Sequence, residues 1–139
     1  CEMAAYYKSV GSSILEQLEA IYGKFGRYLH KVDSFTFEGL SGMETMAKLM
    51  AGLRADGLAS IAGWKVTKST DYENDPTGLP KADVLTYWLE NGAAVIVRPS
   101  GTEPKIKVYY SVPAATRAEA EQQQKLLATA ARGLLGFAK

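Results

Sequence analysis

The sequence predicts an α+β fold, in which two helices pack on one face of an antiparallel sheet of about four strands. A further helix precedes this domain in the chain. Three observations predict this architecture. From residue 40 onward, a segment of helical periodicity is followed by short alternating segments and then by a second helical segment. Turns and loops, not helices, separate the alternating segments, which favours antiparallel strands. The chain has 139 residues, 47% of them apolar, which is enough to bury one core.

Residues 1–22 predict one amphipathic helix. Their apolar side chains recur at spacings of three or four, and Gly23 and Gly26 end the pattern. The periodic positions are Met3, Tyr7, Val10, Ile14, Leu18 and Ile21. We expect this helix to be the last element of a preceding domain, so that residues 1–30 hold the helix and a hinge. Residues 31–139 then form a C-terminal domain, and the weak alternation of residues 28–37 predicts a connecting strand at its start.

The next predicted helix begins at Ser41 and ends near residues 55–57. We expect Ser41 to cap the helix and Glu44, three residues later, to reach back to the Ser41 amide. The face of this helix that is expected to meet the core contains Met43, Met46, Ala47, Met50 and Leu53.

The sheet is predicted from the segments that follow. Residues 63–69 alternate as a half-buried strand, and residues 72–83 form a loop. Two apolar segments then flank Asn91-Gly92, the pair that best tolerates the positive φ angles of a type I′ hairpin turn. The last predicted strand covers residues 106–112. One of its faces carries Ile106, Val108, Tyr110 and Val112, and the other carries Lys107, Tyr109 and Ser111.

A C-terminal helix completes the fold. Pro113 is expected to close the preceding strand, after which Thr116 caps the helix and Glu119 is its capping partner. The helix is expected to run to about Leu135. Its small apolar face consists of Ala120, Gln124, Leu127, Ala130 or Ala131, and Leu134.

Composition excludes several classes of function. Sixteen basic and fifteen acidic side chains give a net charge of +1. The chain therefore lacks the excess of positive charge that would attract nucleic acid or an anionic membrane without specificity. Any anion site must be local. The single cysteine, Cys1, and the lack of a secretory pattern favour a cytoplasmic location. No run approaches the roughly 20 continuous apolar residues that cross a bilayer, so we expect no membrane partner.

Common catalytic arrangements are also missing. The chain has one histidine, His30, and neither HExxH nor CxxC spacing, so it predicts no zinc site and no Ser-His-Asp site. We interpret His30 as a residue that caps or packs near a helix end. Asp71, Glu73 and Asp75 alternate as cation ligands can, but the acidic position that ends a calcium loop is missing. A solvated loop is the favoured interpretation of residues 71–75.

Aromatic side chains on strands raise the possibility of RNA binding, because such rings can stack on bases. The aromatic residues concerned are Trp64, Tyr87, Trp88, Tyr109 and Tyr110. However, one face of the sheet must be buried under the helices, so many of these rings belong to the core. With a near-neutral chain and no glycine-aromatic string of the RNA-binding type, we expect no nucleic-acid partner.

The octet RPSGTEPK, residues 98–105, is the strongest candidate for a site. Gly101 permits a close approach and unusual φ angles, so that consecutive amides can converge on an anion. Arg98 offers a two-pronged donor matched to phosphate, while Ser100, Thr102 and Lys105 add hydroxyls and a charge.

Two features of the octet complicate this interpretation. Pro99 and Pro104 stiffen the loop and reduce the entropy lost on binding, but Glu103 opposes an anion unless it points outward or pairs with a cation. Glycine, serine, threonine and proline are also common in ordinary polar turns. Residue chemistry alone therefore leaves a polar turn and a phosphate site as open alternatives.

A family resemblance extends through most of the chain. The segment VIVRPSGTEPKIKVYY, residues 95–110, resembles the signature of the C-terminal domain of the phosphohexomutases, the phosphoglucomutase and phosphomannomutase superfamily. LPKADVLTYWLENG, residues 79–92, is similar to its bacterial phosphoglucomutase branch, and residues 1–28 resemble the last helix of the family's third domain. The resemblance implies a domain of the TATA-box-binding-protein-like fold.

The resemblance also implies a function. Family members transfer a phosphoryl group from a phosphoserine to a sugar monophosphate through a bisphosphorylated sugar, with Mg²⁺ in the second domain. It implies that Arg98, Ser100, Gly101 and Thr102 contact the nonreacting phosphate and that Lys105 contributes. Glucose or mannose phosphates and the other domains of the parent enzyme would then be the partners.

The resemblance also shows what this chain lacks. The family's phosphoserine loop, magnesium loop and sugar loop have no counterpart in these residues, so we expect the chain alone to be inactive and to hold no cofactor. The alternatives are a stand-alone module that binds phosphosugars or RNA without catalysis, and a purely structural interaction domain.

Overall fold

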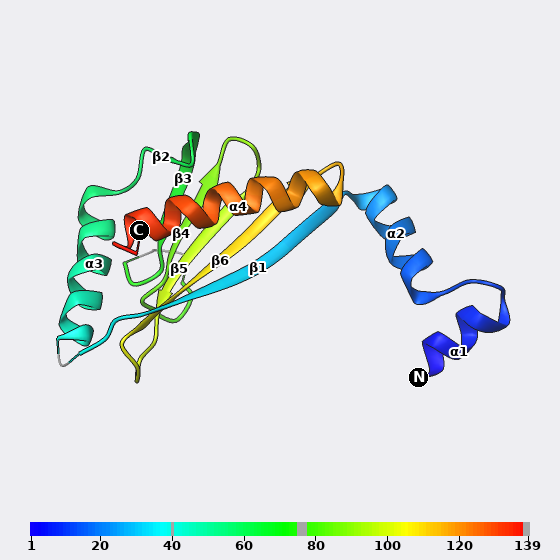
Figure 1. Cartoon of the computed structure of the whole chain (residues 1–139), viewed down its shortest axis with the longest axis horizontal. Helices are drawn as coiled ribbons and strands as arrows, with labels where there is room; N and C mark the ends of the chain where they lie inside the picture. Colours follow the sequence, from blue (N-terminus) through cyan, green and yellow to red (C-terminus); the bar gives the residue numbers. More distant parts are fainter. Residues whose placement is uncertain (40, 75–77, 138–139) are drawn as a thin grey trace.

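The computed structural model describes residues 1–39, 41–74 and 78–137, which form four helices and six strands (Figure 1). The six strands form one sheet in the order β1-β6-β5-β4-β3-β2, and every neighbouring pair is antiparallel. The helices are α1 (Glu2–Ser9), α2 (Ile14–Phe25), α3 (Gly42–Asp56) and α4 (Arg117–Leu134). The strands are β1 (Arg27–Thr36), β2 (Ser60–Ile61), β3 (Trp64–Asp71), β4 (Leu85–Leu89), β5 (Ala94–Pro99) and β6 (Lys105–Ala114).

The predicted α+β class and the helix-covered sheet are confirmed. Helix α4 runs along one face of the sheet, and α3 lies at the end of the sheet opposite α2 (Figure 1). Alternate residues of β6 are buried beneath the helices, as predicted. The Tyr87 hydroxyl of β4 donates to the Leu53 carbonyl oxygen of α3 at 3.2 Å, which ties α3 to the same face. The core therefore lies between one sheet face and two helices, and no helix of the described residues covers the other face (Figure 1).

The sheet has two strands more than predicted. One is the short β2, which pairs with β3. The other is β1, which was expected only as a connecting strand but pairs along ten residues with β6. Phe35 of β1 is 3% exposed, so this strand contributes to the core as well as to the ladder. The proposed division at residues 30 and 31 falls within β1 and stays a prediction.

The single helix predicted for residues 1–22 is wrong, because the chain forms α1 and α2 instead. Gly11 adopts a φ of 76°, which ends the first helix. Ser13 then starts the second with a capping box: its hydroxyl accepts from the Glu16 amide at 3.2 Å, and Glu16 accepts from the Ser13 amide at 2.7 Å. A local start signal thus overrides the continuous apolar spacing. Figure 1 shows both helices projecting from one end of the sheet.

The predicted cap of α3 is also wrong, although the helix is present. Ser41 has φ −87° and ψ 2°, not the extended conformation of a capping serine, and its side chain makes no capping hydrogen bond. Glu44 instead pairs with Lys48 at 2.7 Å. Within the predicted face, Met46 and Met50 are buried, whereas Met43 and Ala47 are exposed.

The C-terminal helix begins as predicted, because the Thr116 hydroxyl accepts from the Glu119 amide at 3.2 Å. Its buried face comprises Ala120, Gln124, Leu127 and Ala131. Leu134 is 40% exposed and Leu135 is buried in its place.

The strand before this helix does not stop at Pro113 but continues to Ala114. The ladder between β5 and β6 ends at the pair Ala94 and Ser111, so Pro113 has only β1 as a ladder partner. A proline without an amide is tolerated where one neighbouring strand has already ended. Among the described residues, none of the helices combines the length and apolar character needed to cross a membrane.

Candidate phosphate-binding site

The octet 98–105 forms the connection between β5 and β6 at one end of the sheet. The loop is closed by its own backbone: the Ser100 amide donates to the Lys105 carbonyl oxygen at 2.8 Å, and the Lys105 amide donates to the Glu103 carbonyl oxygen at 2.7 Å. The Glu103 amide donates to the Ser100 hydroxyl oxygen at 3.3 Å. These bonds give the loop a defined shape without using its central amides.

The centre of the loop presents hydrogen-bond donors to solvent. Gly101 and Thr102 are exposed, and in the part of the chain that the structure describes no hydrogen bond engages their amides. The unusual φ expected at Gly101 is not observed, because its φ lies outside the left-handed region. The space around its α carbon is open, with no atom within 4 Å of a Cβ built there. A ligand can therefore approach the backbone closely at this position.

Arg98 supplies a free positive charge beside these amides. It is the penultimate residue of β5 and is exposed, and none of the described residues forms an ion pair or hydrogen bond with its guanidinium group. An exposed arginine without a protein partner keeps all its donors for a ligand.

Lys105 and Glu103 form an ion pair, with Lys105 Nζ 3.1 Å from Glu103 Oε2. This contact answers the question that Glu103 raised in the sequence, because the acid pairs with a cation of its own loop. It also means that part of the Lys105 charge is already compensated. The Glu103 side chain is 61% exposed, so another anion can replace it as the partner of Lys105 at a small cost in free energy.

Sequence reasoning did not name Lys107 as a candidate for the site. The register pairs Lys107 of β6 with Arg98 of β5, so the two side chains share the helix-free face, and both are exposed. Like charges directly opposite on neighbouring strands are unfavourable unless an anion lies between them. The alternation of residues 106–112 had placed Lys107 on the outer face. Only the length of the loop, which fixes the register, brings it next to Arg98.

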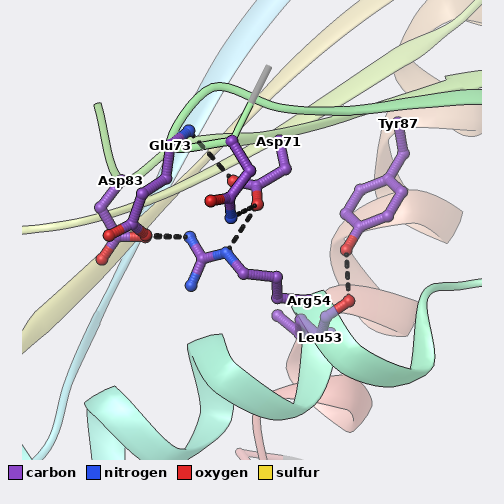
Figure 2. A network of polar contacts seen from close by, with 7 residues as sticks. Leu53, Arg54, Asp71, Glu73, Asp83 and Tyr87 are labelled. Carbon is purple, nitrogen blue, oxygen red and sulfur yellow. Dashed lines mark hydrogen bonds and ion pairs between the residues drawn. The ribbon is translucent and has the colours of Figure 1, made fainter. Parts of the chain in front are cut away.

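A second polar cluster joins Arg54 of α3 to the end of β3 and to both ends of the loop at residues 72–83 (Figure 2). Arg54 Nε lies 2.9 Å from Asp71 Oδ2, and Arg54 Nη2 lies 3.0 Å from Glu73 Oε2 and 2.6 Å from Asp83 Oδ1. Asn74 also donates to Asp71, at 2.7 Å. The solvated loop expected at 71–75 is wrong for Asp71, which ends β3 and whose side chain is 21% exposed, whereas Glu73 lies in an exposed turn as expected and also pairs with Arg54. Asp75 lies outside the described residues.

The electrostatics of this cluster follow from its contacts. Burial disfavours the charged form of Asp71, but hydrogen bonds from Asn74, Arg54 and the Glu73 amide outweigh it and lower the pKa of Asp71. For Arg54, burial acts against the charge while hydrogen bonds to Asp83 and Asp71 raise the pKa. Within the described residues, no group of three or more histidine, cysteine, aspartate or glutamate side chains could hold a metal ion.

The strand aromatics divide between the core and the open face. Tyr87 and Tyr110 are each 1% exposed, and the Tyr110 hydroxyl donates to Asp33 Oδ2 at 3.2 Å. Trp88 lies on the other face, where Lys68 Nζ is 5.0 Å from its ring centroid. His30 lies in the middle of β1, stacked on Tyr28 with the ring centroids 6.3 Å apart, so its expected place near a helix end is wrong.

Comparison with known proteins places this fold and loop in a family. The family model described as "Phosphoglucomutase/phosphomannomutase, C-terminal domain" matches residues 3–130. A phosphoglucomutase of Staphylococcus epidermidis is 36% identical over 120 residues, which cover 78% of this chain and 22% of that protein. A phosphomannomutase of Mycoplasma pneumoniae is 31% identical over 131 residues, or 91% of this chain and 22% of that protein.

A solved structure supports the same assignment at the level of the fold. The open form of the Paramecium phosphoglucomutase pp63/parafusin aligns with a TM-score of 0.60 and 18% identity, covering 91% of this chain and 24% of that one. The fold and the matched sequence define a C-terminal domain of a phosphosugar mutase. The chain belongs to the phosphoglucomutase/phosphomannomutase family and corresponds to its C-terminal domain. It spans about a fifth of the length of the curated relatives that it matches.

Proposed function

We propose that this domain binds the nonreacting phosphate of a sugar phosphate in a phosphohexomutase that interconverts sugar 1-phosphates and sugar 6-phosphates. The observation that carries the proposal is the loop at the end of β5, where the Gly101 and Thr102 amides and the Arg98 guanidinium are exposed and free of protein partners among the described residues. Charge-assisted hydrogen bonds from such donors are the interactions that a phosphate group favours.

Each residue of the site has a role in this proposal. Arg98 provides the two-pronged charged contact, and the amides of Gly101 and Thr102 donate to the phosphate oxygens. Ser100 and Thr102 add hydroxyl donors. Lys105, which pairs with Glu103, contributes more weakly, while Lys107 adds a second positive charge beside Arg98.

Binding at this loop would assist chemistry that occurs elsewhere. A fixed phosphate sets the distance and direction of the hydroxyl at the far end of the sugar, so that positioning, not a chemical step, is the contribution of this domain. A loop that recognises phosphate and ignores sugar stereochemistry also suits a ligand that binds in two orientations. We assign the phosphoserine and the Mg²⁺ of the reaction to other parts of the parent enzyme. The chain alone is expected to bind the sugar phosphate and to leave it unconverted.

The proposal is tested by titrating the chain with glucose 1-phosphate and following the ³¹P signal of the ligand. The dissociation constant is expected on the order of millimolar, because most contacts of a complete cleft are missing. Arg98→Ala should weaken binding at least about tenfold, since a hydrogen bond to a charged group contributes about 1.5–3 kcal/mol. Lys125→Ala is the matched control, because it removes an exposed cation from α4. Equal weakening in the two variants would reduce the binding to a general charge effect.

The alternative, a stand-alone RNA-binding module, places the ligand on the sheet face and not at the loop. Its one supporting observation is the helix-free face, which carries Trp88 and Tyr109 beside exposed cations. A titration with a single-stranded RNA oligonucleotide distinguishes this alternative from phosphate binding, because bases that stack on these rings would shift the NMR signals of Trp88 and Tyr109. We expect no such shift and no competition between RNA and glucose 1-phosphate.

A further inference from the structure

Gly42, the first residue of α3, lies against the loop of residues 98–105, which we call the phosphate loop. Gly42 is buried, and a Cβ at this position would lie 2.5 Å from the Phe37 carbonyl oxygen and 3.0 Å from Cβ of Pro104. Both distances are shorter than van der Waals contact. The φ of Gly42 lies outside the left-handed region, so this glycine is needed for space and not for its backbone conformation. Figure 1 shows the start of α3 and the turn between β5 and β6 at the same end of the sheet.

Phe37 cannot easily yield to an added methyl group. Its amide donates to the Pro104 carbonyl oxygen at 2.8 Å, which extends the pairing of β1 with β6 by one step. Its ring is 9% exposed and packs edge-on against Phe137, with ring centroids 5.0 Å apart. An atom added at Gly42 therefore either presses on Pro104 directly or shifts the Phe37 backbone, and because the Phe37 amide is bonded to the Pro104 carbonyl oxygen, either movement reaches Pro104.

A shift of Pro104 would reach the residues that face the ligand. Two of the three bonds that shape the loop involve Glu103, the residue before Pro104: the Lys105 amide donates to the Glu103 carbonyl oxygen, and the Glu103 amide donates to the Ser100 hydroxyl. Gly101 and Thr102 lie between Ser100 and Glu103, so their exposed amides move with this frame.

We infer that Gly42 is a positioning residue for the phosphate loop: its bare α carbon lets the first turn of α3 seat Pro104 and thereby sets the direction of the Gly101 and Thr102 amides. The inference rests on the proposed phosphate-binding function. Gly42 does not touch the ligand and acts through Pro104. Displacements of about 1 Å in such supporting contacts can cost orders of magnitude in function.

The test compares Gly42→Ala with Gly52→Ala in the 139-residue chain. Gly52 lies in the same helix, and a Cβ there meets nothing within 4 Å, so Gly52→Ala controls for the change in helix propensity. In Gly42→Ala we expect glucose 1-phosphate to bind about tenfold more weakly and the ¹⁵N–¹H signals of Gly101 and Thr102 to shift in the ligand-free protein. In Gly52→Ala the affinity for glucose 1-phosphate and the signals of Gly101 and Thr102 should match those of the unmodified chain.

Two outcomes overturn parts of this account separately. If Gly42→Ala leaves both the loop signals and the affinity unchanged, the positioning role is wrong while the proposed function stands. If the unmodified chain binds no glucose 1-phosphate, the proposed function is wrong, and shifted loop signals in Gly42→Ala would still support the contact through Pro104.

A measurement on the unmodified chain keeps the inference testable should Gly42→Ala fail to fold. Saturation with glucose 1-phosphate is expected to slow hydrogen exchange of the Phe37 amide, which donates to Pro104, by about threefold or more. The Leu89 amide, which donates to Ala93 in the other hairpin of β5, should not change. Equal exchange at Phe37 with and without ligand would contradict coupling between the loop and its support.

Discussion

The two ends of β5 carry two hairpin loops of similar composition but opposite organisation. At the start of β5, three of the four amides of residues 90–93 are used within the fold: Glu90 donates to the Lys65 carbonyl at 3.0 Å, Gly92 to the Leu89 carbonyl at 2.9 Å and Ala93 to the Asn91 side chain at 3.1 Å. Asn91 also donates to Gln123 of α4 at 3.0 Å. At the other end, residues 100–104 leave two amides and the neighbouring Arg98 open to solvent.

This difference separates a structural turn from the loop that we propose binds phosphate. Both loops contain glycine and polar residues, so composition does not distinguish them. What distinguishes them is the destination of each donor. A loop whose donors are used internally contributes to stability, whereas a loop that holds its shape and still leaves donors free can bind a ligand. Substitutions in the first loop should therefore change stability, and those in the second should change binding.

The largest expected effect is the loss of phosphate binding in Arg98→Ala without loss of stability. We expect affinity for glucose 1-phosphate to fall at least about tenfold, while the free energy of unfolding changes by less than about 0.5 kcal/mol, because an exposed side chain without partners contributes little. Urea unfolding followed by circular dichroism measures the second quantity. A large drop in stability would show that Arg98 has a structural role, and the contrast between the two loops would fail.

Gly92→Ala should give the reverse pattern. Gly92 has a φ of 81°, and a Cβ would lie 3.2 Å from Pro113 Cγ. The left-handed conformation costs a residue with a Cβ about 1–2 kcal/mol, so stability is expected to fall by that amount or slightly more. Affinity for glucose 1-phosphate should not change. Weaker binding in a folded Gly92→Ala chain would mean that the two loops are coupled through β5.

A third loop, which follows β3, is predicted to make the domain sensitive to acid. Because the pKa of Asp71 is lowered in the folded state, its contribution to stability is complete above the unfolded pKa of about 3.9 and is lost as the pH falls through the lower folded value. Thermal unfolding between pH 2 and 6 should therefore show a loss of stability below about pH 4 that is smaller in Asp71→Asn. Asp56→Asn, at an exposed position of α3, is the control. Identical pH profiles in the two variants would contradict the role of the Arg54 cluster.

The smallest expected effect concerns Glu103. Glu103→Gln removes the partner of Lys105 and one negative charge beside the loop. Binding of glucose 1-phosphate should tighten by about twofold to threefold, and stability should change little, since exposed ion pairs contribute about 0–1 kcal/mol. Glu38→Gln makes the same charge change at an exposed position. If both substitutions tighten binding equally, net charge and not the Lys105 pair is responsible.

Local patterns predicted much of this fold. The alternation of β6, the capping residue Thr116 and the hairpin between β4 and β5 are all present. The turn type of that hairpin was predicted wrongly, because among its residues only Gly92, not Asn91, has a positive φ. The ladder closes around three residues, since the Leu89 amide bonds to Ala93, and this larger turn needs one left-handed residue instead of two.

Long-range contacts account for most of what the sequence could not predict. The weak alternation of β1 did not reveal that this strand pairs with β6, whose residues lie about 70 to 90 positions later in the chain. The closeness of Lys107 to Arg98, and of Gly42 to Pro104, likewise depends on register and on helix placement. The octet could be singled out from sequence as a candidate site because its residues are contiguous, although residue chemistry alone left a polar turn and a phosphate site as open alternatives.

The most direct test of the contrast between the two loops is one ¹⁵N–¹H NMR titration of the chain with glucose 1-phosphate. The predicted result is a set of saturable shifts at residues 98–105, except the two prolines, and at Lys107, while the signals of residues 90–93 stay in place. Shifts at residues 90–93, or none at residues 98–105 at saturating ligand, would contradict the assignment of the open loop as the phosphate site.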